Sequence, residues 1–235
     1  MDFKNDPVGF ALHDYEAGKK TESILVTSDL CDDDEIPVAH LFRSFDEMPE
    51  LEKFALSFCK GKILDVGAGA GCHSLYLYKK FETLSIDISQ GAVNLMNQKG
   101  LNAQRKTIFE IENEKFDTIL LLMNGIGLAG SIEKLPAFLM QLKKLLNEGG
   151  KIICDSTDLS YLYADDDGSF MIDLNAKYYG EMQFNMIYQK EETGWFDWLY
   201  IDGDNLTDIA NRCGLKCTLL FEGDTNHYLV SLEHQ

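Results

Sequence analysis

The chain lacks the sequence features that would place it in or on a membrane. Among its 235 residues no stretch of about 18 apolar residues occurs, the length needed to span a bilayer. The segment from Met1 to Asp6 has no apolar core of a secretion signal. Basic side chains are scarce, since 21 Lys and Arg residues face 39 Asp and Glu residues, giving a net charge of −18. Nucleic acids and anionic membrane surfaces require a basic partner. We therefore expect a cytoplasmic protein that binds neither, with an acidic surface that keeps it in solution.

The cysteines show no spacing that is typical of a zinc site. Cys213 and Cys217 are expected to lie on either side of the junction between a helix and a strand. Several of the others fall inside predicted strands or helices, where cysteine behaves as a small apolar residue. We expect all six to be free thiols in a reducing compartment, and no metal site.

The most informative stretch is an apolar run of strand length, followed by alternating glycines. From Asp65 to Gly71 its pattern is Asp-x-Gly-x-Gly-x-Gly, and a helix is predicted to follow. Glycines let a backbone approach a ligand closely, and a helix N-terminus offers free N–H groups. Cys72 stands where a dinucleotide-binding fingerprint needs its third glycine. No Gly-Lys-Ser/Thr of a P-loop follows either. The stretch therefore predicts a nucleotide-type binding loop of another kind.

This stretch resembles motif I of the class I S-adenosylmethionine-dependent methyltransferases, which residues 63–71 match without a gap. Three further elements resemble that family in order: a second strand ending at Asp87, a fourth strand opening at Phe116, and a Gly-Gly pair before the fifth strand. The resemblance implies a three-layer, Rossmann-like α/β sandwich. Its seven-stranded sheet would be mainly parallel, with an antiparallel last strand. The chain is most similar to stand-alone bacterial enzymes that act on small molecules.

The resemblance also implies which residues bind S-adenosylmethionine. Asp65 and the glycine loop would hold its methionine end, and Asp87 would accept hydrogen bonds from both ribose hydroxyls. Family members often carry an acid after the third strand, near the adenine amino group. Here either Glu110 serves, or the adenine is held by the backbone and by apolar side chains. The expected cofactor residues are Asp65, Gly67, Ala68, Gly69, Gly71, Asp87, Ile88, Ile108, Phe109 and Asn124.

The loop from Met123 to Leu128 bears on the acceptor. It carries neither the Asn/Asp-Pro-Pro-aromatic sequence of adenine- and glutamine-modifying methyltransferases nor the Pro-Cys of DNA cytosine enzymes. Loops at the carboxyl ends of strands carry the sites of open α/β sheets. The candidate substrate contacts are Tyr15, Arg43, Asp155, Thr157, Asp158, Tyr161 and Trp198, with Asn124 beside them. For each of them a purely structural role is the competing interpretation: a cap for the two aspartates, core packing for the tryptophan. No catalytic residue is assigned.

Two segments are additions to the core. We divide the single domain 1–235 into an N-terminal extension and helix (1–60), a cofactor-binding core (61–158), an inserted hairpin or lid (159–202), and a terminal helix with the last two strands (203–235). Residues 181–201 alternate apolar and polar positions around a turn, which predicts a hairpin. Together the two additions supply Tyr15, Phe42, Arg43, Tyr161, Tyr163, Trp195 and Trp198. These side chains predict a lid over a small-molecule pocket, with Arg43 binding a carboxylate. In the competing interpretation the hairpin buries its aromatic side chains against the sheet or forms a dimer contact.

The sequence thus predicts an enzyme that transfers a methyl group from S-adenosylmethionine to a nitrogen or oxygen of a small molecule, as monomer or homodimer. Two alternatives stay open. One is a protein that binds S-adenosylmethionine without catalysis. The other is a nicotinamide-dependent oxidoreductase on a related sheet, against which Cys72 and the Gly-Gly before the fifth strand count.

Overall fold

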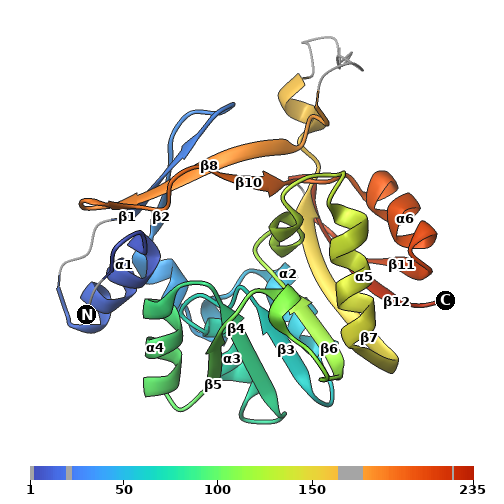
Figure 1. Cartoon of the computed structure of the whole chain (residues 1–235), viewed down its shortest axis with the longest axis horizontal. Coiled ribbons are helices and arrows are strands. Elements are labelled where there is room, and N and C mark those ends of the chain that lie inside the picture. Colours follow the sequence, from blue (N-terminus) through green and yellow to red (C-terminus); the bar gives the residue numbers. More distant parts are fainter. Residues whose placement is uncertain (1–2, 20–22, 164–176, 224) are drawn as a thin grey trace.

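The computed structural model describes residues 3–19, 23–163, 177–223 and 225–235, which form two β-sheets and the helices around them (Figure 1). The main sheet has seven strands in the order β11-β12-β7-β6-β3-β4-β5. Its strands are β3 (Ile63–Val66), β4 (Thr83–Asp87), β5 (Asn102–Arg105), β6 (Phe116–Leu121), β7 (Leu146–Thr157), β11 (Leu215–Glu222) and β12 (His227–His234). The neighbours from β5 to β7 pair in parallel. The last strand, β12, is antiparallel to both β7 and β11. The predicted sheet is confirmed.

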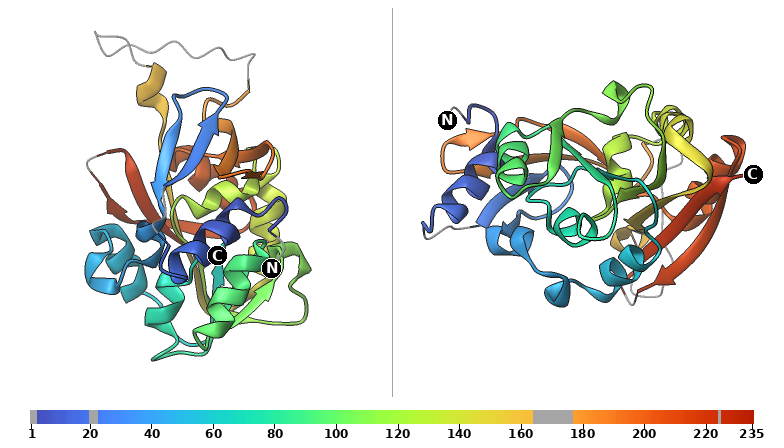
Figure 2. Two further views of the ribbon diagram at one scale, coloured as in Figure 1. Left: turned by 90° about the vertical axis from the view of Figure 1, so that its left-hand side faces the viewer. Right: turned by 90° about the horizontal axis from the view of Figure 1, so that it is seen from below.

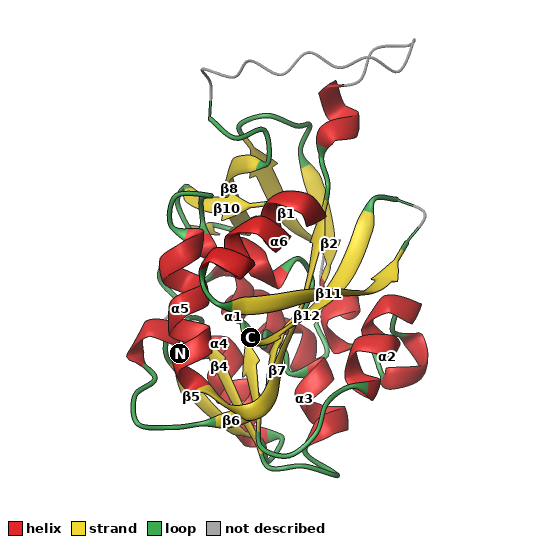
Figure 3. Ribbon diagram, turned by 90° about the vertical axis from the view of Figure 1, so that its right-hand side faces the viewer, coloured by secondary structure: helices red, strands yellow, loops and turns green. Residues whose placement is uncertain are grey.

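Helices cover both faces of this sheet, because its central strands are apolar on both sides. In β6, Ile119 faces the cluster that includes α5 (Leu135–Leu145) and α6 (Gly203–Arg212). The next residue, Leu120, faces the cluster that includes α2 (Glu50–Ser57) and α3 (Cys72–Leu77). Figure 3 shows α5 and α6 on one side of the strands and α2 and α3 on the other. This arrangement is the three-layer sandwich that the sequence predicts.

A second sheet joins two segments that are far apart in the sequence. It contains β1 (Ser23–Ser28), β2 (Asp34–Pro37), β8 (Glu181–Tyr188), β9 (Glu191–Glu192) and β10 (Phe196–Leu199). Its order is β10-β8-β1-β2, with β9 on β8, and all pairs are antiparallel. The hairpin of β8 and β10 was predicted, whereas β1 and β2 were not. Figures 1 and 2 show this sheet lying across the end of the main sheet at which the parallel strands finish.

The helix α1 (Pro7–Glu16) packs between the second sheet and α4 (Gln90–Gln98). The two helices approach so closely that a Cβ at Gly91 would lie 2.4 Å from Gly9 Cα. Asp6 is the N-cap of α1 and accepts the Gly9 N–H at 2.9 Å. It also accepts the Gly91 N–H at 3.0 Å, in the first turn of α4. One carboxylate therefore caps two helices and holds them together.

Short 3₁₀ helices complete the fold: η1 (Val38–Phe42), η2 (Phe45–Glu47), η3 (Ile108–Glu110), η4 (Gly125–Ala129) and η5 (Ser160–Tyr163). The third strand of the core, β5, ends at Arg105, and Ile108 begins η3. Ser89 is the N-cap of α4 and accepts the Ala92 N–H at 3.0 Å.

All six cysteines are free thiols, as predicted. Within the described residues, no cluster of His, Cys, Asp and Glu side chains has the arrangement of a metal site. In the same part of the chain, no helix has the length and apolar character needed to cross a membrane.

Candidate active site

The glycine loop directly follows β3 and depends on the conformational freedom of glycine. Gly67, Gly69 and Gly71 have φ angles of 71°, 56° and 80°, which residues with a side chain rarely adopt. A Cβ at Gly71 would lie 2.9 Å from the side chains of Leu101 and Met96, so this glycine also lets α4 pack closely. At Gly69 no described atom lies within 4 Å of the Cβ position. The middle of the loop therefore presents bare backbone to open space.

Asp87, at the end of β4, holds this loop in place. Its Oδ2 accepts the Gly69 N–H at 2.8 Å, and its Oδ1 accepts the Ser89 N–H at 2.8 Å. Burial raises the pKa of Asp87, while the two N–H donors act in the opposite direction. Each carboxylate oxygen has a second acceptor position. Asp87 can therefore still accept two hydrogen bonds from a ligand diol.

Asp65 lies within β3 and is 2% exposed. Its Oδ2 accepts the Ser74 hydroxyl at 2.6 Å, and the hydroxyls of Ser74 and Ser85 are 2.7 Å apart. Burial raises the pKa of Asp65, against the opposing influence of His73 and the Ser74 hydrogen bonds. The carboxylate thus connects β3 to α3 below the glycine loop, and its role toward a cofactor stays a prediction.

Exposed apolar side chains follow the ends of three of the parallel strands, β4, β5 and β6. Ile88 after β4 is 68% exposed, Phe109 after β5 is 57% exposed, and Leu128 after β6 is 40% exposed. Ile108, predicted beside them, is buried in the main core instead of exposed, and its contact with the adenine stays a prediction. Exposed apolar groups that gather at a strand end indicate a binding surface for a flat apolar group.

The acid after the third strand is used locally. Glu110 Oε2 accepts both the N–H and the hydroxyl of Thr107, at 2.7 and 2.9 Å, in a capping box around η3. The two hydrogen bonds from Thr107 hold the pKa of Glu110 below its usual value. Of the two expectations for the adenine, this favours backbone and apolar contacts over the Glu110 carboxylate.

The ends of β6, β7 and β12 are connected by polar side chains. Asn124 Oδ1 accepts the Thr157 hydroxyl at 2.9 Å. Asp155 is 1% exposed, and its Oδ1 accepts the Gly125 N–H at 3.3 Å. Its Oδ2 lies 2.8 Å from His227 Nε2. The structure brings together three of the predicted residues here and adds His227, which sequence reasoning missed because this histidine belongs to no motif.

Asp158, Tyr161 and Trp198 have different surroundings. Asp158 accepts the Ser160 N–H at 2.8 Å, which is the predicted capping role, and the Tyr179 hydroxyl at 2.8 Å. Tyr161 is 51% exposed, in η5. Trp198 packs on η4, where a Cβ at Gly127 would lie 2.2 Å from the indole nitrogen. Trp198 therefore seats the second sheet on the loop that follows β6.

The N-terminal candidates lie on the α2 side. Tyr15 stacks on Phe42, with ring centroids 4.4 Å apart. Arg43 is 5% exposed and binds Glu52 through Nε at 3.0 Å and Nη2 at 2.7 Å. The expectation that Arg43 binds a ligand carboxylate is not supported, because the Glu52 carboxylate occupies its guanidinium.

His73 completes this buried group, with Nε2 2.8 Å from Glu52 Oε2. Burial acts to lower the pKa of His73, but hydrogen bonds with Cys72 and Glu52 and the nearby acid Asp65 raise it to about 10. Two cations, Arg43 and His73, thus lie buried beneath the start of α3, balanced by carboxylates.

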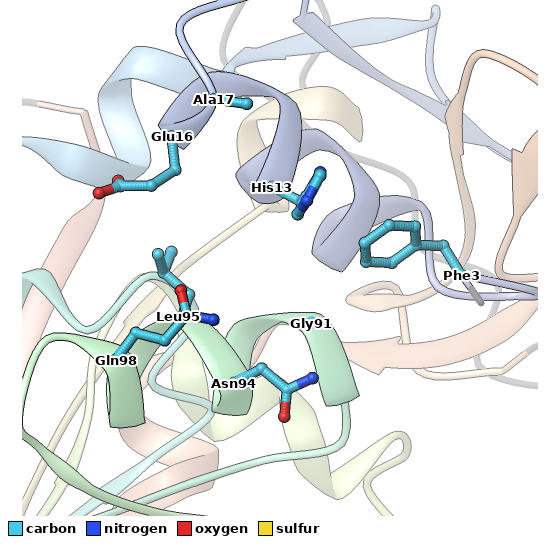
Figure 4. A pocket seen from close by; sticks show the side chains of 8 residues that line it. All are labelled: Phe3, His13, Glu16, Ala17, Gly91, Asn94, Leu95 and Gln98. Carbon is cyan, nitrogen blue, oxygen red and sulfur yellow. The ribbon is translucent and has the colours of Figure 1, made fainter. Parts of the chain in front are cut away.

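A cavity of about 220 Å³ lies between α1 and α4 (Figure 4). It is lined by Phe3, His13, Glu16, Ala17, Gly91, Asn94, Leu95 and Gln98. None of the predicted site residues lines it, so the strand ends rather than this cavity form the candidate site.

The sequence matches a known protein family, and the structure resembles solved structures. Residues 39–220 match the family described as "Methyltransferase domain". The structure is similar to a SAM-dependent methyltransferase from Bacteroides fragilis, solved in complex with S-adenosyl-L-homocysteine. The two share 42% sequence identity and a TM-score of 0.92, over 100% of this chain and 97% of that one. No curated protein sequence matches the chain.

Two more distant structures share the fold. CalS10, an amino pentose methyltransferase from Micromonospora echinaspora with SAM bound, has 11% identity and a TM-score of 0.57, over 81% of this chain and 94% of that one. The sugar N-methyltransferase KedS8 from a Streptoalloteichus species has 12% identity and a TM-score of 0.53, over 79% and 85%.

Proposed function

Because the chain belongs to the S-adenosylmethionine-dependent methyltransferases, we propose that it methylates a nitrogen or oxygen of a small-molecule acceptor. The enzyme class and the cofactor, S-adenosyl-L-methionine, follow from the family. The family also rules out the nicotinamide-dependent alternative. The identity of the acceptor and the residues that bind the acceptor and S-adenosylmethionine are inferred below from the structure.

The residues at the strand ends fit the cofactor. The open backbone at Gly69 and the free acceptor positions of Asp87 suit a ligand that carries a ribose diol. The exposed side chains of Ile88 and Phe109 suit a flat base beside it. When bound, the cofactor supplies a methyl group activated by a sulfonium, which leaves as a neutral thioether. The protein's task is to orient the acceptor atom toward that methyl group and to exclude water.

The observation that carries the small-molecule proposal is the second sheet. It lies across the strand ends at which the cofactor residues gather (Figure 1), and Trp198 seats it on η4. A nucleic acid acceptor needs an open basic groove, whereas this chain has a covering sheet and a net charge of −18. The second sheet is thus proposed as a lid over a small acceptor. One relative in fold is named as an amino pentose methyltransferase and another as a sugar N-methyltransferase, which is consistent with an acceptor of that size.

The same proposal places the protein in the cytoplasm. The six free thiols support a reducing, cytoplasmic environment.

The test uses S-adenosylmethionine labelled with ¹³C in its methyl group. The purified protein is incubated with this cofactor and a cell extract, which is then separated into small-molecule, protein and nucleic acid fractions. The Asp87→Ala variant, with weakened cofactor binding, is the control. We expect label only in the small-molecule fraction and only with the wild-type protein. Label in protein or nucleic acid contradicts the proposal, and no label in any fraction supports the non-catalytic alternative.

A further inference from the structure

His227 and Asp155 form a pair that the cofactor site does not need. His227 begins β12 and lies opposite Thr157 at the end of β7. Its side chain is 31% exposed, whereas that of Asp155 is 1% exposed. His227 Nε2 lies 2.8 Å from Asp155 Oδ2, while Asp155 Oδ1 accepts the Gly125 N–H. One nitrogen of a partly exposed imidazole is thus hydrogen-bonded to a buried carboxylate.

This arrangement fixes which ring nitrogen carries the proton. A carboxylate only accepts hydrogen bonds, so Nε2 must be the protonated nitrogen of the neutral ring. Nδ1 then keeps its lone pair. Within the described part of the chain the His227 side chain makes no other hydrogen bond. The buried partner therefore leaves a nitrogen that can accept a proton at the more exposed end of the ring.

The pair also lies at the carboxyl end of β7, the end of the parallel strands at which ligands bind. Sequence order reverses between β3 and β6, since β4 and β5 extend on one side and β7 and β12 on the other. Ligands of open α/β sheets bind outside the strand ends at such a reversal. The cofactor residues follow β3, β4 and β5. Asp155 accepts a hydrogen bond from Gly125 in the loop after β6, and His227 lies against Asp155. His227 therefore lies on the other side of the reversal from the cofactor residues, on the side that is left for an acceptor.

A role in holding the strands together does not require the pair. β7 and β12 are already paired along six positions, from Ile152 opposite Leu232 to Thr157 opposite His227. Burying a carboxylate costs free energy unless it is compensated. A buried acid behind a half-exposed histidine is the arrangement by which acids orient histidine bases in hydrolases of unrelated folds.

We propose that His227 is the general base of the transfer, that Asp155 is its positioning residue, and that the acceptor atom is a hydroxyl oxygen. The choice of oxygen follows from the chemistry, because a hydroxyl needs a base whereas an amine that arrives neutral does not. The acceptor O–H bond breaks and its proton goes to His227 Nδ1. The oxygen lone pair forms the new bond to carbon as the C–S bond breaks, with its electron pair left on sulfur. The positive charge passes from the sulfonium to the imidazolium, beside the Asp155 carboxylate.

This inference deepens the proposed function and rests on it, so its first test uses the same ¹³C-labelled cofactor and extract. We expect His227→Ala to lower the rate of label transfer by about 100-fold or more, the usual contribution of a general base. Binding of S-adenosylhomocysteine should be unchanged, and added imidazole should restore part of the rate. Asp155→Asn should show a loss of the same kind, because a ring protonated at Nδ1 cannot accept the proton. The matched control is His234→Ala, an exposed histidine at the other end of β12, which should behave as wild type.

The products identify the acceptor atom. In a ¹H–¹³C spectrum the carbon of an O-methyl group resonates apart from that of an N-methyl group, and we expect O-methyl signals. N-methyl products from the wild-type protein refute the hydroxyl assignment. Equal rates for wild type and His227→Ala refute the base while leaving the proposed function intact. If the wild-type protein labels only protein or nucleic acid, the proposed function fails, and the rate of His227→Ala on that fraction still decides the role of His227.

A second test needs no acceptor. Long-range ¹H–¹⁵N spectra of the histidine side chains, assigned by comparison with His227→Ala, report which nitrogen of His227 is protonated. We expect the Nε2-protonated form in the wild-type protein and a change of form in Asp155→Asn. A neutral His227 protonated at Nδ1 refutes the proposal, because no lone pair is then left for the acceptor proton.

Discussion

The change of Asp87 to alanine is the sharpest test of the cofactor site. Asp87 Oδ1 and Oδ2 each accept one backbone N–H at 2.8 Å, which leaves one further acceptor position on each oxygen for the ribose hydroxyls. Hydrogen bonds to a charged group contribute about 1.5–3 kcal/mol each. Losing both therefore costs about 3 kcal/mol at the low end, which weakens binding by roughly 100-fold. Isothermal calorimetry with S-adenosylhomocysteine measures this directly, and unchanged affinity would show that Asp87 does not bind the ribose.

The pH dependence of the same binding supplies an internal check. Burial raises the pKa of Asp87 in the ligand-free protein. Only the ionised carboxylate accepts from both hydroxyls, so affinity should fall as the pH decreases through this raised pKa and stay level above it. In Asp87→Ala this dependence should disappear. The fold should survive the change, because Asp87 is partly exposed at the end of β4 and only the N–H groups of Gly69 and Ser89 lose their acceptor.

Three further predictions follow from the packing. Gly69→Ala should cost about 1–2 kcal/mol of stability through its left-handed backbone and should also weaken cofactor binding. Gly71→Ala has the same backbone strain and a Cβ that overlaps α4, so it should lower the free energy of unfolding by about 1–3 kcal/mol more. Chemical denaturation and calorimetry of the two variants check this. The pKa of His73 is about 10 in the folded protein against an ordinary value of 6.5. The contribution of His73 to the free energy of unfolding is therefore complete below about pH 6.5 and is lost as the pH rises through about 10. The thermal unfolding midpoint should fall over this range, and Glu52→Gln should make it depend less on pH. Trp198→Ala should raise the KM for the acceptor and leave S-adenosylhomocysteine affinity unchanged, since it loosens the proposed lid; equal KM values would show that the second sheet does not contribute to the acceptor site.

The main sheet was predictable because its signals are local. The strands β3, β4, β6 and β7 each carry an apolar run, whereas β5, with the sequence Asn-Ala-Gln-Arg, does not. The glycine loop and the N-cap Ser89 mark where helices begin. The second sheet was only half predictable. Its hairpin alternates within one segment, but β1 pairs with β8 across the chain, as Leu25 opposite Ile187 shows. Nothing near residues 23–37 in the sequence reveals a partner so distant.

The positions of the candidate site residues were predictable where a motif marks them. Asp87 and the glycines are such residues, because their hydrogen bond and backbone angles form the loop, while their contacts with the cofactor stay a prediction. Arg43 was misjudged because its partner, Glu52, lies on a separate helix, and only the fold brings the two together. His227 had no signal at all, because its role depends on the register of β12 against β7.

The carboxylate of Asp6 connects α1 to the first turn of α4, which lies next to the candidate cofactor site. Gly91, whose N–H it accepts, follows Asp87 by one short loop, and α1 leads directly toward β1 of the second sheet. A movement of that sheet which displaces α1 must break this hydrogen bond and separate Gly9 from Gly91. The first turn of α4 then loses a cap right beside the carboxylate that holds the glycine loop. Opening the proposed lid and loosening the glycine loop therefore involve the same contacts, so we expect a bound cofactor to favour the closed lid and a closed lid to raise the affinity for the cofactor.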